Sequence, residues 1–195
     1  MITSLEELKT RRWYKHYPEA IRQQRESYTL PEIPLYRFLE SSAKYYPNST
    51  AMIYEPENFI VSYKDLHELC LKFAAGLQKK FGVEKGDRIA ICARNYPEFL
   101  IAHFGIIMAG AVYVACNPIL IQDELVYLFK DSQCHIVIIA DDMAPVLKNI
   151  IDAKETAVEK VIVFNRDTEL KPALFGRKAD RSLTPPFYSY GQVFS

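Results

Sequence analysis

The chain alternates between segments in which apolar residues recur every three or four positions and short uninterrupted apolar runs. The first pattern is typical of amphipathic helices, and the second of strands buried on both faces of a parallel sheet. The longest apolar stretch lies between Phe99 and Cys116, where His103 is the one markedly polar residue in eighteen. Because Gly110 and a β-branched run divide it, this stretch predicts a buried helix followed by a strand, rather than a membrane span of ~20 residues.

Helices are predicted where the apolar period is three to four residues and a cap or a breaker bounds the segment. The first opens at the capping-box pattern Ser4-x-x-Glu7 and is interrupted by Pro18. Asn95 and Asp141 are the expected caps of two later helices. The predicted helices are Ser4 to Pro18, about Leu35 to Tyr45, Ser62 to Gly82, Asn95 to Met108, a segment from about Asp123, the stripe from Met143 to Ile151, and a last helix from near Ser189.

Strands are predicted where the apolar residues are continuous and turn residues bound them. Thr50–Tyr54 and Phe59–Val61 flank a polar turn and predict a hairpin. Asn165 to Phe187 is polar and is expected to be a surface loop. Alternation of strands and helices predicts an α/β fold with a mostly parallel sheet covered by helices on both faces. The further predicted strands are Arg88–Cys92, Ala111–Cys116, Ile136–Ala140 and Lys160–Phe164.

Composition narrows the class of protein. The 195 residues include 24 Lys plus Arg and 24 Asp plus Glu, and 49% of them are hydrophobic. That content suits a packed core, and the balanced charge argues against a nucleic-acid-binding protein, which relies on a basic face. The chain opens with Met1-Ile2-Thr3-Ser4 and lacks the basic tip and apolar core of a secretory signal. We expect a cytoplasmic protein that is not transmembrane, with peripheral membrane contact left open.

Cysteines, histidines and paired acids do not form a metal or catalytic pattern. The four cysteines are 22, 24 and 18 positions apart, and their apolar neighbours favour buried free thiols. No two histidines have H-x-x-x-H spacing. Asp141-Asp142 could bind a metal through two carboxylates, but a role at the start of a helix is favoured. The cysteines and histidines are Cys70, Cys92, Cys116, Cys134, His16, His67, His103 and His135.

Nucleotide-binding and hydrolase motifs are also absent from the sequence. Gly105-x-x-x-x-Gly110 has the glycine spacing of a P-loop, but Ala111-Val112 stands where the lysine and the hydroxyl residue must be. These glycines are expected to serve close helix packing and a helix end. No G-x-G-x-x-G and no G-x-S-x-G occurs. From the residues alone, the chain is an α/β domain without a recognisable active site.

Several short motifs nevertheless follow one another in a fixed order: Ser62-Tyr63-x-x-Leu66, Gly86-Asp87-Arg88-Ile89, Asn95-x-Pro97-Glu98-Phe99, Ala109-Gly110-Ala111, Asn117-Pro118, Glu124-Leu125 and Asp131-Ser132. This order, from about Leu35 to Phe164, resembles the N-terminal part of the adenylate-forming (AMP-binding) enzymes. The segment Arg11–Ile21, with its Trp and Tyr-Pro, resembles long-chain fatty-acyl-CoA synthetases. Ala115 departs from the pattern, because many relatives carry proline there.

The resemblance implies a ligase that activates a fatty acid with ATP to an acyl-adenylate and transfers the acyl group to coenzyme A. It also implies that the phosphate-binding loop, the adenine and ribose contacts and the magnesium-binding glutamate come after the region matching Ser195. We therefore name no catalytic, cofactor-binding or metal-binding residue in this chain. The parent enzyme is expected to use ATP, Mg²⁺ and coenzyme A, and the isolated chain is expected to be inactive and to bind none of them.

The expected organisation is a helical extension and linker over residues 1–33 and a partial α/β subdomain over residues 34–195, truncated before the phosphate-binding loop. The expected partners are a fatty acid, the missing downstream domains and a second copy in a homodimer. Two alternatives stay open. One is another adenylate-forming enzyme, such as an aryl-CoA ligase, a luciferase-like enzyme or an amino-acid adenylation domain. The other is a non-catalytic α/β binding or assembly module.

Overall fold

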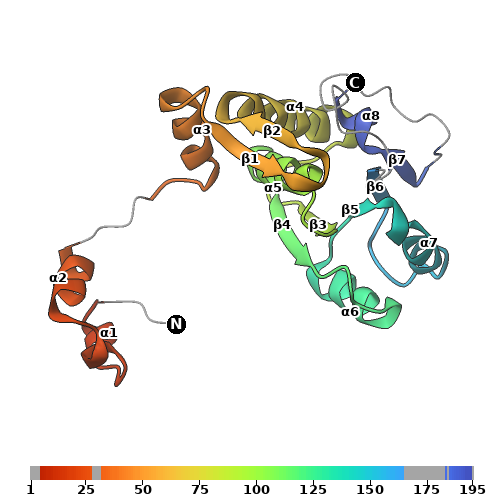
Figure 1. Cartoon of the computed structure of the whole chain (residues 1–195). Helices are drawn as coiled ribbons and strands as arrows, with labels where there is room; N and C mark the ends of the chain where they lie inside the picture. Colours follow the sequence, from red (N-terminus) through yellow and green to blue (C-terminus); the bar gives the residue numbers. More distant parts are fainter. Residues whose placement is uncertain (1–4, 28–31, 165–182, 184, 195) are drawn as a thin grey trace. The chain divides into compact units, whose positions relative to one another are not determined.

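The computed structural model describes residues 5–27, 32–164, 183 and 185–194 (Figure 1). The chain divides into two compact units, Met1–Pro34 and Leu35–Ser195. Among the helices that the structure describes, none combines the length and the apolar composition needed to cross a bilayer.

The first unit contains α1 (Leu5–Lys9), a 3-10 turn (Tyr14–His16) and α2 (Glu19–Ser27). The expected capping residue Ser4 lies outside the described residues. The prediction of one helix running to Pro18 was wrong. The Thr10 hydroxyl donates to the Glu7 carbonyl at 2.8 Å where α1 ends, and such local bonds compete with helix continuation. Pro18 precedes α2, and its carbonyl accepts the N–H groups of Ile21 and Arg22.

The second unit begins with α3 (Tyr36–Tyr45) and a hairpin of β1 (Thr50–Tyr54) and β2 (Phe59–Ser62), all of which confirm the sequence-based expectation. A 3-10 turn at Glu55–Glu57 joins the strands, and Asn58 at φ 48° completes the reversal. The left-handed conformation is one that Asn tolerates better than most residues.

A five-stranded, wholly parallel sheet follows, with the strand order β4-β3-β5-β6-β7. Its four longer strands confirm the predicted apolar runs. The three-residue strand β7 was not predicted, because it pairs only with β6 and its sequence has no apolar run. The strands are β3 (Arg88–Cys92), β4 (Val112–Cys116), β5 (Ile136–Ala140), β6 (Lys160–Phe164) and β7 (Phe187–Ser189).

Helices cover both faces of this sheet, as expected (Figure 1). Alternate residues of each strand belong to different cores: Ile89 and Ile91 pack with α4, α5 and α8, whereas Ala90 and Cys92 pack with α6 and α7. The period of two along a strand explains this division. The helices are α4 (Tyr63–Phe81), α5 (Pro97–Met108), α6 (Gln122–Ser132), α7 (Ala144–Asp152) and α8 (Tyr190–Phe194).

The predicted ends of α4 are confirmed, and two other predicted caps are wrong. Ser62 accepts the Asp65 N–H at 3.1 Å, and Gly82 ends α4 at φ 69°. The N-cap of α5 is Tyr96, not Asn95, because a residue before proline favours the extended conformation. Asp141 begins a 3-10 turn, Asp141–Met143, and the residue before α7 is Met143.

Candidate functional site

The carboxyl edge of the parallel sheet is the place where this topology can build a site. The connection after β3 runs through α5 on one face, and the connection after β5 runs through α7 on the other face. Since β3 and β5 are neighbours in the sheet, their carboxyl ends form a topological switch point. Ligands of open α/β sheets bind in such crevices.

Three segments meet at this edge: the ends of β3, β4 and β5. Cys92 and Cys116 are partners in the parallel register. The Cys92 thiol lies 3.8 Å from the Asn117 carbonyl oxygen. A hydrogen bond with Cys116 lowers the pKa of Cys92, and burial and the nearby Asp142 carboxylate oppose that shift. The same hydrogen bond and burial raise the pKa of Cys116.

The paired acids after β5 support the turn that they begin. The Asp141 carboxylate accepts the N–H of Asp142 at 3.0 Å, and Asp142 is exposed. Across residues 5–27, 32–164 and 185–194, no group of three His, Cys, Asp or Glu side chains is placed to hold a metal ion. Asn117 has a similar local role, because its side-chain oxygen accepts the Ile119 N–H at 3.1 Å.

Gly105 and Gly110 have the structural roles expected of them. Gly105 is buried in α5 against Phe73 of α4, and a Cβ built on it would lie 2.6 Å from the Phe73 Cδ1 atom. Gly110 follows the helix at φ 83°, and its carbonyl accepts the Gly86 N–H at 3.0 Å. Neither glycine belongs to a phosphate-binding loop.

The histidines are distributed over separate elements. His103 is half-buried in α5, where its ring packs with those of Phe99, Phe104 and Tyr113. Burial lowers the pKa of His103, and its Nδ1 atom has no hydrogen-bond partner. His16 and His135 are exposed, and His67 is half-buried on α4. Within the second unit, the structure therefore brings no two of His67, His103 and His135 together as a catalytic pair.

All four cysteines are free and buried, as expected. Burial raises the pKa of Cys70 to about 12, and burial also raises the pKa of Cys134. A thiol with a raised pKa is a poor nucleophile at neutral pH, since the thiolate is the reactive form.

Sequence reasoning did not identify two surface hollows. One, of about 270 Å³, is lined by Lys80, Phe81, Lys160, Tyr188 and Gln192. Its lysines have structural partners, because Lys160 Nζ donates to the Phe81 carbonyl at 2.8 Å and Lys80 Nζ to the Gln192 carbonyl at 3.1 Å.

The second hollow, of about 580 Å³, lies on α6 and the residues before it. Its lining is Leu120, Asp123, Glu124, Tyr127, Leu128 and Asp131. The exposed apolar side chains Ile119, Ile121 and Tyr127 belong to the same stretch of chain. The sequence does not reveal this hollow, because acidic residues recur every few positions and the pattern is that of an ordinary amphipathic helix.

Residues of the ordered motifs connect neighbouring elements of the sheet domain. The Asp87 carboxylate accepts the Glu84 N–H at 2.9 Å, and the Asp87 carbonyl accepts the Val112 N–H at 2.7 Å. The turn before β3 is thereby tied to the start of β4. At the other end of these strands, the Tyr190 hydroxyl donates to the carbonyl of the buried Glu98 at 3.0 Å. This links α5 to α8.

Comparison with known proteins identifies relatives for most of this chain. The family model described as AMP-binding enzyme matches residues 39–187. A long-chain-fatty-acid–CoA ligase of Bacillus subtilis is 32% identical over 133 residues, which is 68% of this chain and 23% of the relative. A long-chain-fatty-acid–CoA ligase of Yersinia pestis is 29% identical over 181 residues, 90% of this chain and 31% of the relative. The chain thus spans about a quarter to a third of the length of these relatives.

A solved structure agrees with the sequence relatives. The crystal structure of a long-chain-fatty-acid–CoA ligase from Archaeoglobus fulgidus aligns with a TM-score of 0.65 at 25% identity, covering 70% of this chain and 28% of that one. The α/β fold with its parallel sheet is the one found in that structure. In the Yersinia pestis alignment about 20 residues of the 195 stay unmatched, fewer than the 34 of the first unit, so the alignment extends into Met1–Pro34.

Proposed function

Because the chain belongs to the AMP-binding enzyme family, we propose that it forms the N-terminal part of a long-chain-fatty-acid–CoA ligase. Such a ligase joins a fatty acid to ATP as an acyl-adenylate, with loss of pyrophosphate. The thiol of coenzyme A then displaces AMP and takes the acyl group. The observation that carries the proposal is the 32% identity to the Bacillus subtilis ligase over 68% of this chain. ATP, Mg²⁺ and coenzyme A are the cofactors and co-substrate that this reaction requires.

The proposed role of this chain is to build one wall of the enzyme rather than to perform the chemistry. Its motif residues cap α4 and join the starts of β3 and β4, and Gly105 allows the close packing of α5 on Phe73 of α4. A phosphate cradle needs exposed backbone N–H groups and a lysine. The glycine pair of this chain is used for packing and for a helix end instead. We propose that the phosphate-binding loop, its lysine and the magnesium-binding glutamate lie in the remaining part of the enzyme.

The carboxyl edge of the sheet is the proposed point of contact with that remaining part. Arg94 and Asn95 are exposed after β3, and Asp142 is exposed after β5. We propose that residues 1–33 form an extension and that residues 34–195 form part of a larger α/β domain. In the intact protein, an acyl pocket would be completed by residues from outside this chain, and the organisation predicts that these 195 residues alone are inactive.

Thioester formation by the enzyme that contains this chain tests the proposal. The purified enzyme is given ATP, Mg²⁺, coenzyme A and a series of acids: straight-chain fatty acids of increasing length, an aryl acid and an amino acid. We expect acyl-CoA and pyrophosphate in equal amounts, with long-chain fatty acids preferred. A preference for the aryl acid or the amino acid would contradict the fatty-acid assignment alone. If none of the acids leads to release of pyrophosphate, that result would contradict ligase activity and favour a non-catalytic module.

A further inference from the structure

The first unit has an uneven distribution of charge. From Lys9 to Tyr17 the chain reads KTRRWYKHY, with four lysines and arginines and no acidic residue. Trp13 and Tyr14 lie between Arg12 and Lys15, and a third aromatic residue, Tyr17, ends the segment. The acidic residues of α1 and α2 lie on either side of this segment, and Glu32 follows α2 in the chain. Whether a given lysine or arginine lacks an ion-pair partner therefore depends on which cations these carboxylates contact.

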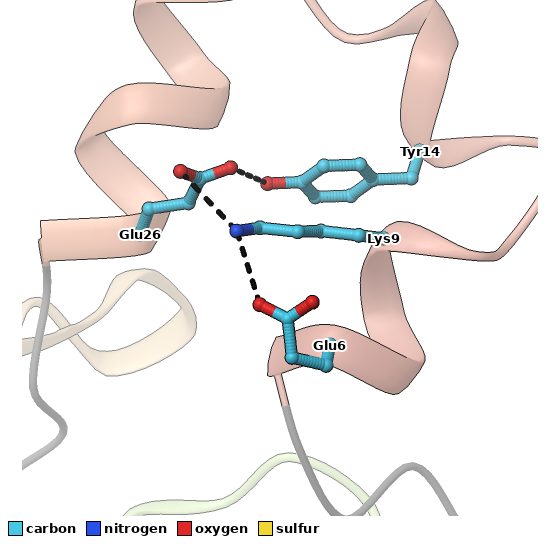
Figure 2. A network of polar contacts seen from close by, with 4 residues as sticks. All are labelled: Glu6, Lys9, Tyr14 and Glu26. Atoms are coloured by element: carbon cyan, nitrogen blue, oxygen red, sulfur yellow. Dashed lines mark hydrogen bonds and ion pairs between the residues drawn. The ribbon is translucent and has the colours of Figure 1, made fainter.

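Figure 2 shows that two of the acids are held by a single lysine. Lys9 Nζ lies 3.4 Å from a Glu6 carboxylate oxygen and 3.7 Å from a Glu26 carboxylate oxygen. The Tyr14 hydroxyl donates to the other Glu26 oxygen at 3.0 Å. This network joins α1, the turn and α2. In it, the carboxylates of Glu6 and Glu26 share a single cation, the ammonium group of Lys9.

The other acid of each helix, Glu7 in α1 and Glu19 in α2, is also engaged. Glu7 pairs with Arg11 at 2.7 Å, and Glu19 accepts a hydrogen bond from Gln23 at 3.2 Å. Within the described part of the chain, neither Arg12 nor Lys15 lies in an ion pair, and both side chains are exposed. The turn between α1 and α2 thus presents two uncompensated cations to solvent.

Aromatic rings are exposed beside these cations. Trp13 is 45% exposed and Tyr17 is 36% exposed, and their ring centroids are 6.0 Å apart. The buried ring of Tyr14 packs edge-on against both, at 6.4 and 6.3 Å. Because Tyr14 is also bonded to Glu26, it holds the two exposed rings in place. Trp and Tyr side chains, each with an apolar ring and a polar tip, favour the boundary between lipid and water.

We propose that the turn Arg11–Tyr17 is a docking surface for an anionic lipid bilayer. Trp13 and Tyr17 would enter the headgroup region, and Arg12 and Lys15 would contact lipid phosphates. Each basic residue near an anionic surface adds to binding, and interfacial rings add an apolar contribution. The inference rests on the charges and rings of this unit and not on the proposed function. It agrees with that function because fatty acids partition into bilayers.

The experiment uses the fact that Trp13 is the single tryptophan of the chain. Its emission is recorded while the 195-residue chain is mixed with phosphatidylcholine vesicles that contain about one third phosphatidylglycerol, with co-sedimentation measured in parallel. We expect a blue shift and sedimentation with these vesicles, both weakened by added salt. Pure phosphatidylcholine vesicles are expected to give much weaker responses.

Two charge variants separate this surface from general electrostatic attraction. Arg12→Gln/Lys15→Gln is expected to lower the vesicle partition coefficient about 30-fold, and Arg12→Glu/Lys15→Glu to lower it further. The control matched to Arg12→Glu/Lys15→Glu is Lys64→Glu/Lys72→Glu. It makes the same change in net charge at exposed positions of α4 in the second unit. The control is expected to bind vesicles within a few-fold of the unchanged chain. Circular dichroism of each variant without lipid verifies that it is folded.

Three results would overturn the proposal. The first is vesicle binding without a change in Trp13 emission. The second is equal binding by Arg12→Glu/Lys15→Glu and by the unchanged chain. The third is a blue shift that grows with protein concentration in the absence of lipid, which would identify a second copy of the chain as the partner of these rings. Failure of the ligase assay would leave all three readouts unaffected, so the two proposals fail separately.

Discussion

Replacing Gly105 by alanine tests how closely α4 and α5 pack. In an unhindered helix, this change stabilises by about 1 kcal/mol. Here the new Cβ would lie 2.6 Å from Phe73 Cδ1, and 3.2 and 3.3 Å from the Phe73 Cβ and Cγ atoms. Phe73 cannot move away easily, because it is fully buried and stacks on Tyr190 at 4.9 Å. Overpacking of this kind costs about 1–3 kcal/mol, so we expect a net loss of up to about 2 kcal/mol.

The same substitution is expected to change sign when the ring is removed. Phe73→Ala removes the Cγ and Cδ1 atoms that would lie against the new Cβ, and itself costs about 3–5 kcal/mol through lost volume. In that background, shifts of a few tenths of an ångström accommodate the Cβ, and Gly105→Ala becomes neutral or stabilising by up to about 1 kcal/mol. The coupling between the two sites is thus expected to reach about 1 kcal/mol or more.

Urea denaturation of the four proteins of this cycle, followed by circular dichroism at a helix band, measures the coupling. Tryptophan emission is unsuitable, because Trp13 lies in the other unit. Equal effects of Gly105→Ala in both backgrounds, or stabilisation in the unchanged chain, would refute the packing role of this glycine.

Three further substitutions have expected outcomes. Ser62→Ala removes the cap of α4 and should lower the free energy of unfolding by about 1 kcal/mol; an unchanged urea midpoint would contradict the cap. Burial raises the pKa of Cys70 from 9.0 to about 12, so the stabilisation by its neutral thiol is complete below pH 9 and is lost as pH rises towards 12. Cys70→Ala should therefore make the decline in the free energy of unfolding between pH 8 and 10 shallower. An identical slope of stability against pH in the variant and in the unchanged chain would contradict this. Burial lowers the pKa of His103 from 6.5, so the stabilisation by its neutral ring is complete above pH 6.5 and is lost on acidification. Between pH 7 and 5, the His103→Leu variant should therefore lose less free energy of unfolding than the unchanged chain, as measured by urea denaturation at each pH.

The elements with strong local signals were predicted almost to the residue. Arg88–Cys92 and Ile136–Ala140 are strands at the predicted bounds, since continuous apolar runs suit strands buried on both faces. Ser62 and Gly82 bound α4 because a hydroxyl cap and a left-handed glycine act locally.

The misses have physical reasons. Within α2, Ile21 is the one large aliphatic residue, so no apolar stripe marks the helix. The strand β7 depends on pairing with β6, a contact distant in sequence. Asn95 has the residue type of a cap, but Pro97 shifts the start of α5 by favouring an extended Tyr96.

The candidate site was less predictable than the fold. Cys92, Asn117 and Asp142 come together only because β3, β4 and β5 are parallel neighbours, and strand order is not visible in the residues themselves. The surplus charge of the first unit is visible in the sequence only in part, because pairing of the acids with Lys9 and Arg11 decides which cations remain.

The central proposal is that these 195 residues build a scaffold and do not perform the nucleotide chemistry. Pyrophosphate release by the purified chain, given ATP, Mg²⁺, a long-chain fatty acid and coenzyme A, tests it most directly, with the proposed longer ligase assayed beside it. We expect turnover by the longer ligase and no release of pyrophosphate above background by the chain alone. Sustained release of pyrophosphate by the chain alone would contradict it.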